Sequence, residues 1–273
     1  MKSEGPVLVD GKQTRRLHPL DRGLQYGDGV FRTMRARPGR IDWWADQYAK
    51  LASDAQALGL ACPPEDLLRT ECLEVSQDVD CVIKLILTRG TGSRGYARPV
   101  DARPTRIVQA FALPDYPAAY STEGIKVRWC SLKLGHQPRL AGIKHLNRLE
   151  NVIARAEWSD PGIAEGLLMD ETGWVVGGVM SNILVIRGKT LFTPDLSQCG
   201  IAGVARMRIM RACLRTGMTV CVTQMRPHDI YNADEVCLCN SLMGVWRIRM
   251  IEDISCGSNG WAGKLRTCLN END

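Results

Sequence analysis

Short strand-like and helix-like segments alternate along most of this chain, a pattern that neither an all-helical nor an all-strand fold accommodates. In the first half, strand patterns cover residues 30–42 and 81–89, and helical patterns cover residues 43–60 and 64–75. The helical patterns repeat apolar side chains every three or four residues, which is typical of a helix with one buried face. The alternation predicts an α/β (α+β) fold class.

A stretch rich in proline and small residues, PDYPAAYSTEG at residues 114–124, separates this half from a second series of strands and helices. Proline and glycine interrupt regular structure, so this stretch is the best candidate for a linker. A chain of 273 residues with 45% apolar composition can form two modest cores. We expect an N-terminal α/β domain at residues 1–113, an interdomain linker at residues 114–124 and a C-terminal α/β domain at residues 125–273.

Charge and hydropathy argue against several classes of partner. The 35 basic and 30 acidic residues are spread along the chain, and no basic tract with interleaved aromatic residues occurs. We therefore expect no nucleic-acid partner. No run of about 18 uncharged apolar residues is present, and the N-terminal MKSEGPVLVDGKQ lacks the apolar core of a secretory signal. The expectation is a cytoplasmic protein with no membrane partner.

The cysteines point to reduced thiols. They number eleven, are scattered, and lie mostly in apolar surroundings such as DEVCLCNSL, which is typical of buried free thiols rather than of a disulfide framework. No CxxC pair occurs. The four histidines do not pair with one another or with cysteines at a ligand spacing, so the sequence predicts no metal site.

The loop RGTGSRGYARP follows the strand at residues 81–89 and contains a GxGxxG pattern. In dinucleotide-binding folds a helix follows such a loop, because the pyrophosphate lies at the helix N-terminus. Here two prolines come next, so nucleotide binding is disfavoured. A loop that directs Arg94 and Tyr96 at a ligand is the simpler interpretation. Arg94 either clamps a carboxylate through two hydrogen bonds or is a solvated loop charge.

The segment GIAGVARMRIM places two glycines before an amphipathic helix at residues 203–217. Backbone N–H groups at such a helix start can bind a phosphate, although most helices preceded by glycine bind nothing. The helix carries four arginines, which the pattern predicts to be mainly solvent-exposed: Arg206, Arg208, Arg211 and Arg215.

The stretch LAGIKHLNRLENVIARAEW contains Lys144. Leu146, Leu149, Ile153 and Ala156 recur at helical spacing, which predicts a helix that begins close to Lys144. A cation in the first turn faces the positive end of the helix dipole, so we expect the pKa of this amine to be lowered. Such a lysine is a better nucleophile for imine formation. Without further information, an ordinary surface charge is the simpler interpretation.

Five segments together resemble one family. LDRGLQYGDGVFRT, LTRGTGSRGYA, LAGIKHLNRLENV, GIAGVAR and DEVCLCNSLMGVW are similar, in this order and at these spacings, to the aminodeoxychorismate lyases of folate biosynthesis. Those enzymes belong to the fold-type IV pyridoxal phosphate enzymes, alongside the branched-chain and D-amino acid aminotransferases. The resemblance covers nearly the whole chain, and AGIKHLNRLE and the RGY loop are specific to the lyase branch. The resemblance favours a chemical role for Lys144.

The resemblance implies a two-domain fold-type IV homodimer with pyridoxal 5'-phosphate in the cleft between the domains. Lys144 would carry the cofactor as a Schiff base. The phosphate would accept hydrogen bonds from the backbone N–H groups of Val204 and Ala205. Ser241 is a weaker candidate for a phosphate contact. Lys50 stands where the family usually has an arginine that anchors the phosphate, and a lysine can still neutralise phosphate as a point charge.

The resemblance also implies the reaction, in which 4-amino-4-deoxychorismate gives 4-aminobenzoate and pyruvate. Lys144, once displaced by the substrate amine, would remove the proton at the amine-bearing carbon. Thr33 matches the hydroxyl thought to assist proton transfer to the pyruvate fragment. Arg94 and Tyr96 would face the substrate. Because the ring becomes aromatic, the task of the enzyme is mostly positioning and charge storage.

Two regions depart from the family, one strand and one helix. The strand that matches GWVVGGVMSN usually carries a glutamate that pairs with the pyridine nitrogen of the cofactor, and here Gly177 stands in its place beside Val176. Loss of that acid weakens the electron sink. In the front helix, Gln47 and Lys50 replace a histidine and the phosphate-anchoring arginine. Restoring glutamate at position 177 is expected to raise cofactor affinity or turnover.

Three interpretations remain open. The first is a working lyase with an altered cofactor site, which we favour because Lys144, Thr33, Arg94 and Tyr96 are all retained. The second is a related aminotransferase, or a lyase for another substrate. Aminotransfer depends more on a protonated ring, so Gly177 counts against it. The third is a non-catalytic homologue that kept the fold and lost the chemistry.

Overall fold

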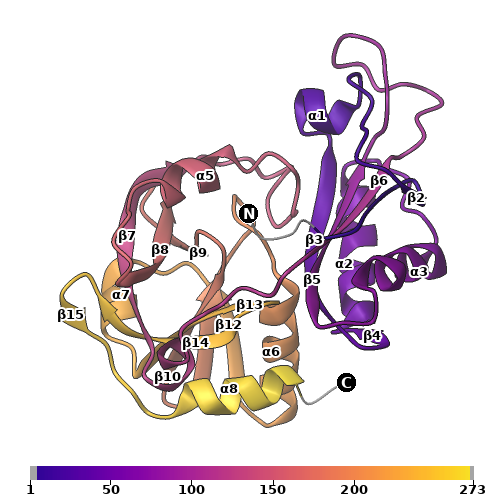
Figure 1. Cartoon of the computed structure of the whole chain (residues 1–273). Helices are drawn as coiled ribbons and strands as arrows, with labels where there is room; N and C mark the ends of the chain where they lie inside the picture. Colours follow the sequence, from indigo (N-terminus) through magenta and orange to yellow (C-terminus); the bar gives the residue numbers. More distant parts are fainter. Residues whose placement is uncertain (1–4, 271–273) are drawn as a thin grey trace. The chain divides into compact units, whose positions relative to one another are not determined.

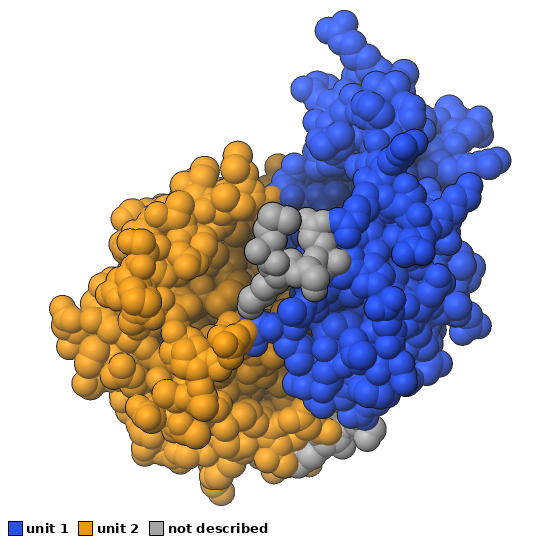
Figure 2. Space-filling model, viewed as in Figure 1, with its two compact units in different colours: residues 1–114, 143–147 blue, residues 115–142, 148–273 orange. Residues whose placement is uncertain are grey.

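The structure is a computed structural model that describes residues 5–270, and it divides into two compact units (Figures 1 and 2). Unit 1 comprises Met1–Pro114 and Ile143–Asn147, and unit 2 comprises Asp115–Gly142 and Arg148–Asp273. Both units combine helices with a sheet, which confirms the expected fold class. The short segment 143–147 differs from the sequence expectation, because it belongs with the first unit although it lies far along the chain.

Unit 1 is built on a six-stranded antiparallel sheet with the order β2-β1-β6-β5-β3-β4. Apolar side chains of α2 and α3 pack with the sheet in one core. The elements of this unit are β1 (Val7–Val9), β2 (Lys12–Gln13), α1 (Arg22–Tyr26), β3 (Gly29–Arg37), β4 (Arg40–Ile41), α2 (Trp44–Ala57), α3 (Glu65–Ser76), β5 (Cys81–Thr88) and β6 (Arg106–Phe111).

Local sequence explains several boundaries in this unit. The β3–β4 hairpin turns at Pro38 and Gly39, where Gly39 adopts a φ of 69°, a backbone conformation that glycine tolerates best. Pro64 caps the start of α3, where a missing N–H group costs little. The two helices and the strands expected in this half are confirmed.

Unit 2 contains a mixed nine-stranded sheet with the order β12-β11-β10-β13-β14-β7-β8-β9, and β15 pairs with β14. Strand β7 runs parallel to both of its neighbours, β8 and β14, and β11 runs parallel to β12. The elements are α4 (Ala119–Thr122), β7 (Ile125–Leu134), α5 (Leu149–Arg155), β8 (Ile163–Asp170), β9 (Val175–Gly178), β10 (Asn182–Arg187), β11 (Thr190–Pro194), α6 (Val204–Arg215), β12 (Thr219–Thr223), α7 (Pro227–Tyr231), β13 (Glu235–Asn240), β14 (Gly244–Ile251), β15 (Ile254–Ser255) and α8 (Trp261–Asn270).

The proline-rich stretch expected as a linker packs against unit 2. Tyr116 and Tyr120 meet the Trp246 ring edge to face, with centroid distances of 4.7 and 5.0 Å. Such aromatic pairs stabilise packing beyond the area that they bury. Residues 115–124 therefore form part of the second core rather than a free connection.

The arginines of α6 correct the expectation of an exposed basic face. Arg206 and Arg208 are only 8% and 4% exposed, whereas Arg211 and Arg215 are exposed as expected. The Arg206 guanidinium donates to the Thr193 hydroxyl at 2.8 Å and to the Pro194 carbonyl at 2.9 Å. These acceptors explain how the charged group is buried, because they satisfy its N–H groups.

Two further expectations concern the whole chain. All eleven cysteines are free thiols and most are buried, which confirms the interpretation of their apolar surroundings. In the part of the chain that the structure describes, none of the helices has the length and hydrophobicity needed to cross a membrane.

A buried carboxylate on β8 holds the turn between β9 and β10. Glu165 is 1% exposed, and its side chain accepts the Gly166 N–H at 3.0 Å, the Met180 N–H at 3.1 Å and the Ser181 hydroxyl at 2.9 Å. Burial raises the pKa of Glu165 to about 7, although these hydrogen bonds lower it. The carboxylate orders residues 178–181 and is costly to ionise there.

We expect Glu165→Gln to change how stability depends on pH. The raised pKa means that the folded chain holds a proton between about pH 4.5 and 7 that the unfolded chain has lost, so this group lowers stability as pH rises through that window. The contribution is roughly 3 kcal/mol at most, since each pKa unit corresponds to about 1.4 kcal/mol. In urea unfolding, the variant should therefore gain about 1–3 kcal/mol relative to the parent between pH 5 and 7.

The matched control is Asp253→Asn, because that carboxylate is 96% exposed. A stability difference between Glu165→Gln and the parent that stays constant with pH would contradict the assignment.

Candidate active site

The segment that contains Lys144 lies along the edge of β3. The Phe31 N–H donates to the Lys144 carbonyl at 3.0 Å, and the Leu146 N–H donates to the Gly29 carbonyl at 3.0 Å. Val30 and His145 form the antiparallel bridge between these two hydrogen bonds. The backbone on both sides of Lys144 is therefore fixed by the sheet of unit 1.

This arrangement corrects the expected helix at Lys144. The helix α5 begins at Leu149, and Leu149 and Ile153 are 69% and 51% exposed instead of forming a buried face. The chain stays extended at residues 144–146 because β3 offers unpaired backbone groups that this segment completes. Lys144 therefore does not lie at the positive end of a helix dipole, and the expected lowering of its pKa loses its basis.

A buried carboxylate on α2 joins Lys144 to two further cations. Asp54 is 1% exposed and accepts the Lys144 backbone N–H at 3.1 Å. The same carboxylate forms ion pairs with Arg32 of β3 and Lys50 of α2. Removal of Asp54 would take the carboxylate away from the buried Arg32 and the half-buried Lys50, which is costly.

The cluster around Asp54 carries more positive than negative charge. Burial, with a smaller effect of Arg32, lowers the pKa of Lys50 to about 8, and burial lowers the pKa of Arg32 to about 10. Both groups remain charged at neutral pH. The Arg32 Nε atom is buried and has no hydrogen-bond partner among residues 5–270. An anion is the ligand type that such a cluster favours.

The opposite face of β3 carries a second group of polar side chains. Phe31 and Thr33 leave the strand on one side, while Arg32 leaves on the other toward α2, because side chains alternate along a strand. Lys84 on β5 lies directly across from Thr33. The Lys144 and Lys84 amines lie 4.5 and 5.5 Å from the centroid of the Phe31 ring. The structure thus brings Lys144, Thr33 and Lys84 together around Phe31.

Lys84 is a candidate that the sequence patterns do not indicate. It occurs in an ordinary strand pattern, CVIKLILTR, where a half-buried lysine has no local signal beyond its polarity among apolar neighbours. Its relation to Thr33 depends on the register of β3 and β5, which only the structure provides.

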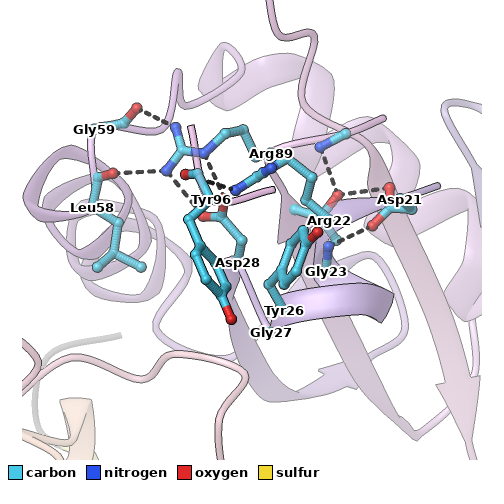
Figure 3. A network of polar contacts seen from close by, with 12 residues as sticks. Asp21, Arg22, Gly23, Tyr26, Gly27, Asp28, Leu58, Gly59, Arg89 and Tyr96 are labelled. Atoms are coloured by element: carbon cyan, nitrogen blue, oxygen red, sulfur yellow. Dashed lines mark hydrogen bonds and ion pairs between the residues drawn. The ribbon is translucent and has the colours of Figure 1, made fainter. Parts of the chain in front are cut away.

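The glycine-rich loop is anchored by an ion-pair network (Figure 3). Arg89 binds Asp28 through two hydrogen bonds of 2.7 and 2.9 Å, and Arg22 binds the same carboxylate at 3.0 Å. Burial raises the pKa of Asp28, but the hydrogen bonds from Arg89 and Arg22 outweigh it, so the pKa is lowered overall. A second nitrogen of Arg22 donates to the Gly95 carbonyl at 2.9 Å. The loop backbone is held in place by charge-assisted contacts.

The two loop residues expected to face a substrate are both on the surface. Tyr96 is 87% exposed, and its ring meets Tyr26 edge to face at 5.6 Å (Figure 3). Arg94 is exposed. The loop leads into β6 rather than a helix, which agrees with the argument against a dinucleotide site. Gly90 is needed because its φ is 83° and an added β-carbon would overlap the Arg103 carbonyl oxygen.

In unit 2, the start of α6 has the features expected of an anion site. Gly203 is the N-cap residue and provides no side-chain cap, and no acidic side chain occupies the first turn. The side chains of Val204 and Ala205 are buried. Asn182 fixes the preceding loop by accepting the Gly203 N–H at 3.1 Å and donating to the Ile201 carbonyl at 2.7 Å. Such a helix start favours a phosphate.

Ser241 lies in the tight turn between β13 and β14 and is half-buried. The Asn240 side chain closes this turn by accepting the N–H groups of Leu242 and Met243 at 2.8 and 2.9 Å.

Gly177 lies within β9, paired with Leu168 of β8. A β-carbon on Gly177 would lie 2.9 Å from the Ser181 carbonyl oxygen, whereas a β-carbon on Gly178 would face the Glu165 carboxylate at 2.9 Å. Because neighbouring residues point to opposite faces of a strand, Glu165 lies on the other side of β9 from position 177. Glu165 therefore does not replace the acid that is missing there.

Comparisons with known proteins agree with the family resemblance of the sequence. An aminodeoxychorismate lyase from Vibrio harveyi is 32% identical over 226 residues, which cover 82% of this chain and 83% of that protein. A putative branched-chain-amino-acid aminotransferase from Methanocaldococcus jannaschii is 30% identical over 234 residues, which cover 84% of this chain and 80% of that protein.

Solved structures agree as well. The crystal structure of 4-amino-4-deoxychorismate lyase from Pseudomonas aeruginosa has a TM-score of 0.93 and 40% identity, covering 97% of this chain and 98% of that one. The Escherichia coli branched-chain amino acid aminotransferase shares the fold with a TM-score of 0.84 at 19% identity, covering 97% of this chain and 93% of that one. Residues 29–251 match the family model for amino-transferase class IV, so the chain belongs to the amino-transferase class IV family.

Proposed function

We propose that this protein is a 4-amino-4-deoxychorismate lyase that forms 4-aminobenzoate and pyruvate for folate biosynthesis, with pyridoxal phosphate as its cofactor. The observation that carries the proposal is the placement of Lys144. Its backbone is fixed against β3 and its amine lies over Phe31, on the face from which Thr33 also projects. Similarity to the lyases of Vibrio harveyi and Pseudomonas aeruginosa supports this activity over aminotransfer.

The residues present fit the phosphate of the cofactor. In unit 1, Lys50 is half-buried, and together with Arg32 it outnumbers the charge of Asp54. In unit 2, the uncapped start of α6 offers the N–H groups of Val204 and Ala205. We assign phosphate binding to Val204, Ala205 and Lys50, with Ser241 as an additional contact. The ring nitrogen has no acid at position 177.

We further propose these roles in the reaction. Pyridoxal phosphate, when bound, supplies a carbonyl carbon that bonds to amines and a ring that stores the electron pair released from the substrate. Lys144 would hold the cofactor through its amine. The same amine would take the proton from the amine-bearing ring carbon of the substrate.

The remaining steps concern the leaving group. The bond between the substrate ring and the enolpyruvyl oxygen breaks, and the ring becomes aromatic. The Thr33 hydroxyl passes a proton to the methylene carbon of the released fragment, which becomes pyruvate. One proton leaves the substrate ring and one is added to the fragment, so the protons balance. Lys84, Arg94 and Tyr96 are assigned to binding the substrate, and the cationic Lys84 suits a carboxylate.

Lys144→Ala is expected to remove both cofactor attachment and activity, because only an amine can form the covalent bond. The measurements are the visible absorbance of protein incubated with pyridoxal phosphate, before and after borohydride, and pyruvate release from aminodeoxychorismate. The matched control is Lys189→Ala, since Lys189 is exposed in the β10–β11 turn. A parent protein that stays colourless with added pyridoxal phosphate would overturn the proposal. Amino transfer from D-alanine, combined with no pyruvate release when aminodeoxychorismate is the substrate, would reassign it to an aminotransferase.

Thr33→Val is expected to lower kcat about 100-fold while the cofactor absorbance is retained, because proton transfer by a positioned side chain contributes about 10²–10⁴-fold. Thr33→Ser restores a hydroxyl at the same position and should recover most of the rate. Steady-state pyruvate release at saturating substrate measures both. Equal kcat values for the parent and Thr33→Val would exclude a role for this hydroxyl in the slow step.

Substitutions at Gly177 separate steric from electronic effects. A β-carbon there approaches the Ser181 carbonyl oxygen at 2.9 Å, so we expect Gly177→Ala and Gly177→Glu each to lose about 1–3 kcal/mol in urea unfolding. Only Gly177→Glu adds an acid, so only this variant should bind pyridoxal phosphate more tightly. If Gly177→Ala matches the parent in stability, the packing argument fails. If both variants bind the cofactor equally, the acid has no effect.

A further inference from the structure

Three side chains with metal-ligating atoms meet in unit 2, outside the residues assigned to catalysis. His136 follows β7, Asp170 ends β8, and Cys199 lies between β11 and α6. One ligand atom from each lies within 4.8 Å of the other two. The closest pair is His136 Nε2 and an Asp170 oxygen, which are 2.9 Å apart. A tetrahedral zinc ion holds its ligands about 3.5 Å from one another, so small side-chain rotations suffice to close the site.

The Asp170 carboxylate is oriented for such a role. Its Oδ1 atom accepts three hydrogen bonds of 2.8 to 2.9 Å, from the N–H and hydroxyl of Thr172 and from the Trp174 N–H. Its Oδ2 atom instead faces His136. One oxygen is thus fixed by the protein while the other points into the cluster, as expected for a ligand that is held in place by its surroundings.

The two nitrogens of His136 face different partners. Nε2 faces the cluster, and Nδ1 lies 3.5 Å from the Glu171 carboxylate. Histidines that bind metals commonly donate their other ring N–H to a carboxylate, which fixes the tautomer and makes the ligating nitrogen more basic. Glu171 lies near this nitrogen, and a small rotation of its exposed side chain would bring it into hydrogen-bond geometry. This second carboxylate is an observation independent of the three-residue cluster.

The backbone segments that carry the three ligands are already joined. The Gln137 N–H donates to the Gln198 carbonyl at 2.8 Å, beside His136 and Cys199. The Glu171 N–H donates to the Leu134 carbonyl at 3.1 Å, beside Asp170. Because the backbone is held, little conformational entropy is lost when the side chains converge on an ion.

Three carboxylates act on the Cys199 sulfur: Asp170, Glu150 and Glu171. A divalent cation bound at this position would offset their negative charge and would stabilise the carboxylates and a coordinated thiolate together.

We propose that His136, Asp170 and Cys199 bind a zinc ion, with Glu171 orienting His136. The sulfur, imidazole and carboxylate donors match the ligands of zinc, and the half-exposed His136 leaves room for a water molecule as the fourth ligand. The sequence expectation of no metal site considered ligands close together in the chain, whereas these three are spread over residues 136–199. The proposal does not depend on the proposed lyase activity.

The ion would fasten two loops that lead to the candidate active site. Residues 135–142 precede Lys144 in the chain, and residues 195–203 precede α6. These loops also pair through hydrogen bonds of 3.0 Å between the Gly142 N–H and the Gly200 carbonyl and 3.1 Å between the Ala202 N–H and the Gly142 carbonyl. The zinc ion would therefore add a second link between two loops that backbone hydrogen bonds already join.

The test uses the full-length chain without an affinity tag, stripped with a chelator and titrated with Zn²⁺ against a chromophoric indicator. We expect one zinc ion per chain and an increase in Tm on binding. Titration with Co²⁺ should give a thiolate-to-cobalt charge-transfer band. Binding of zinc at fewer than one ion per chain, with no cobalt band, would overturn the proposal.

Variants assign the ligands. Cys199→Ser should abolish the cobalt charge-transfer band, and Cys221→Ser is the matched control because Cys221 is also a half-buried cysteine. His136→Gln should abolish tight zinc binding, and it decides the question if Cys199→Ser does not fold. Glu171→Gln should weaken zinc affinity roughly 10-fold, as other changes to hydrogen bonds behind a ligand do. Identical cobalt bands in Cys199→Ser and Cys221→Ser would exclude Cys199.

Discussion

The carboxylate of Asp54 is the interaction on which the arrangement around Lys144 depends. It receives a backbone hydrogen bond from Lys144 and forms ion pairs with Arg32 and Lys50. The segment around Lys144, the strand β3 and the helix α2 thus meet at one buried charge. A buried ionised group is tolerated only when its partners compensate the charge, so the identity of these partners and their distances from Asp54 are constrained. The position of Lys144 against β3 follows from this constraint and from the backbone hydrogen bonds beside it.

The glycine-rich loop is held by a similar arrangement, with Asp28 between Arg22 and Arg89. The side chains of Arg94 and Tyr96 are exposed at the surface, while the loop backbone is held by hydrogen bonds from the Arg22 guanidinium. This combination allows a side chain to present a charge or a ring in a defined place without being buried itself. Both networks of unit 1 therefore use a carboxylate shared by two cations, buried at Asp54 and half-buried at Asp28, to order segments that the sheet alone does not position.

Sequence patterns predicted the strands and helices of the first half, the helix α6 and the mixed fold class. These features depend on local periodicity and on turn residues such as Gly39, which the sequence displays directly. The start of α5 was wrong, because the apolar spacing that includes Leu149 and Ile153 does not reveal whether those side chains are buried. Burial of Arg206 was missed because its acceptors on Thr193 and Pro194 come from another strand. Lys144 and Thr33 were proposed as site residues from family motifs. Lys84 required knowledge of strand register.

The chain crosses between the two units three times, after residues 114, 142 and 147. The lysine-bearing segment is consequently tethered to unit 2 at both of its ends while its hydrogen bonds lie in unit 1. A gene cut once near residue 114 would give a first fragment that lacks one of its own edge segments. To produce the two units separately, residues 143–147 must be returned to unit 1. This can be done by circular permutation or by adding these residues as a separate peptide.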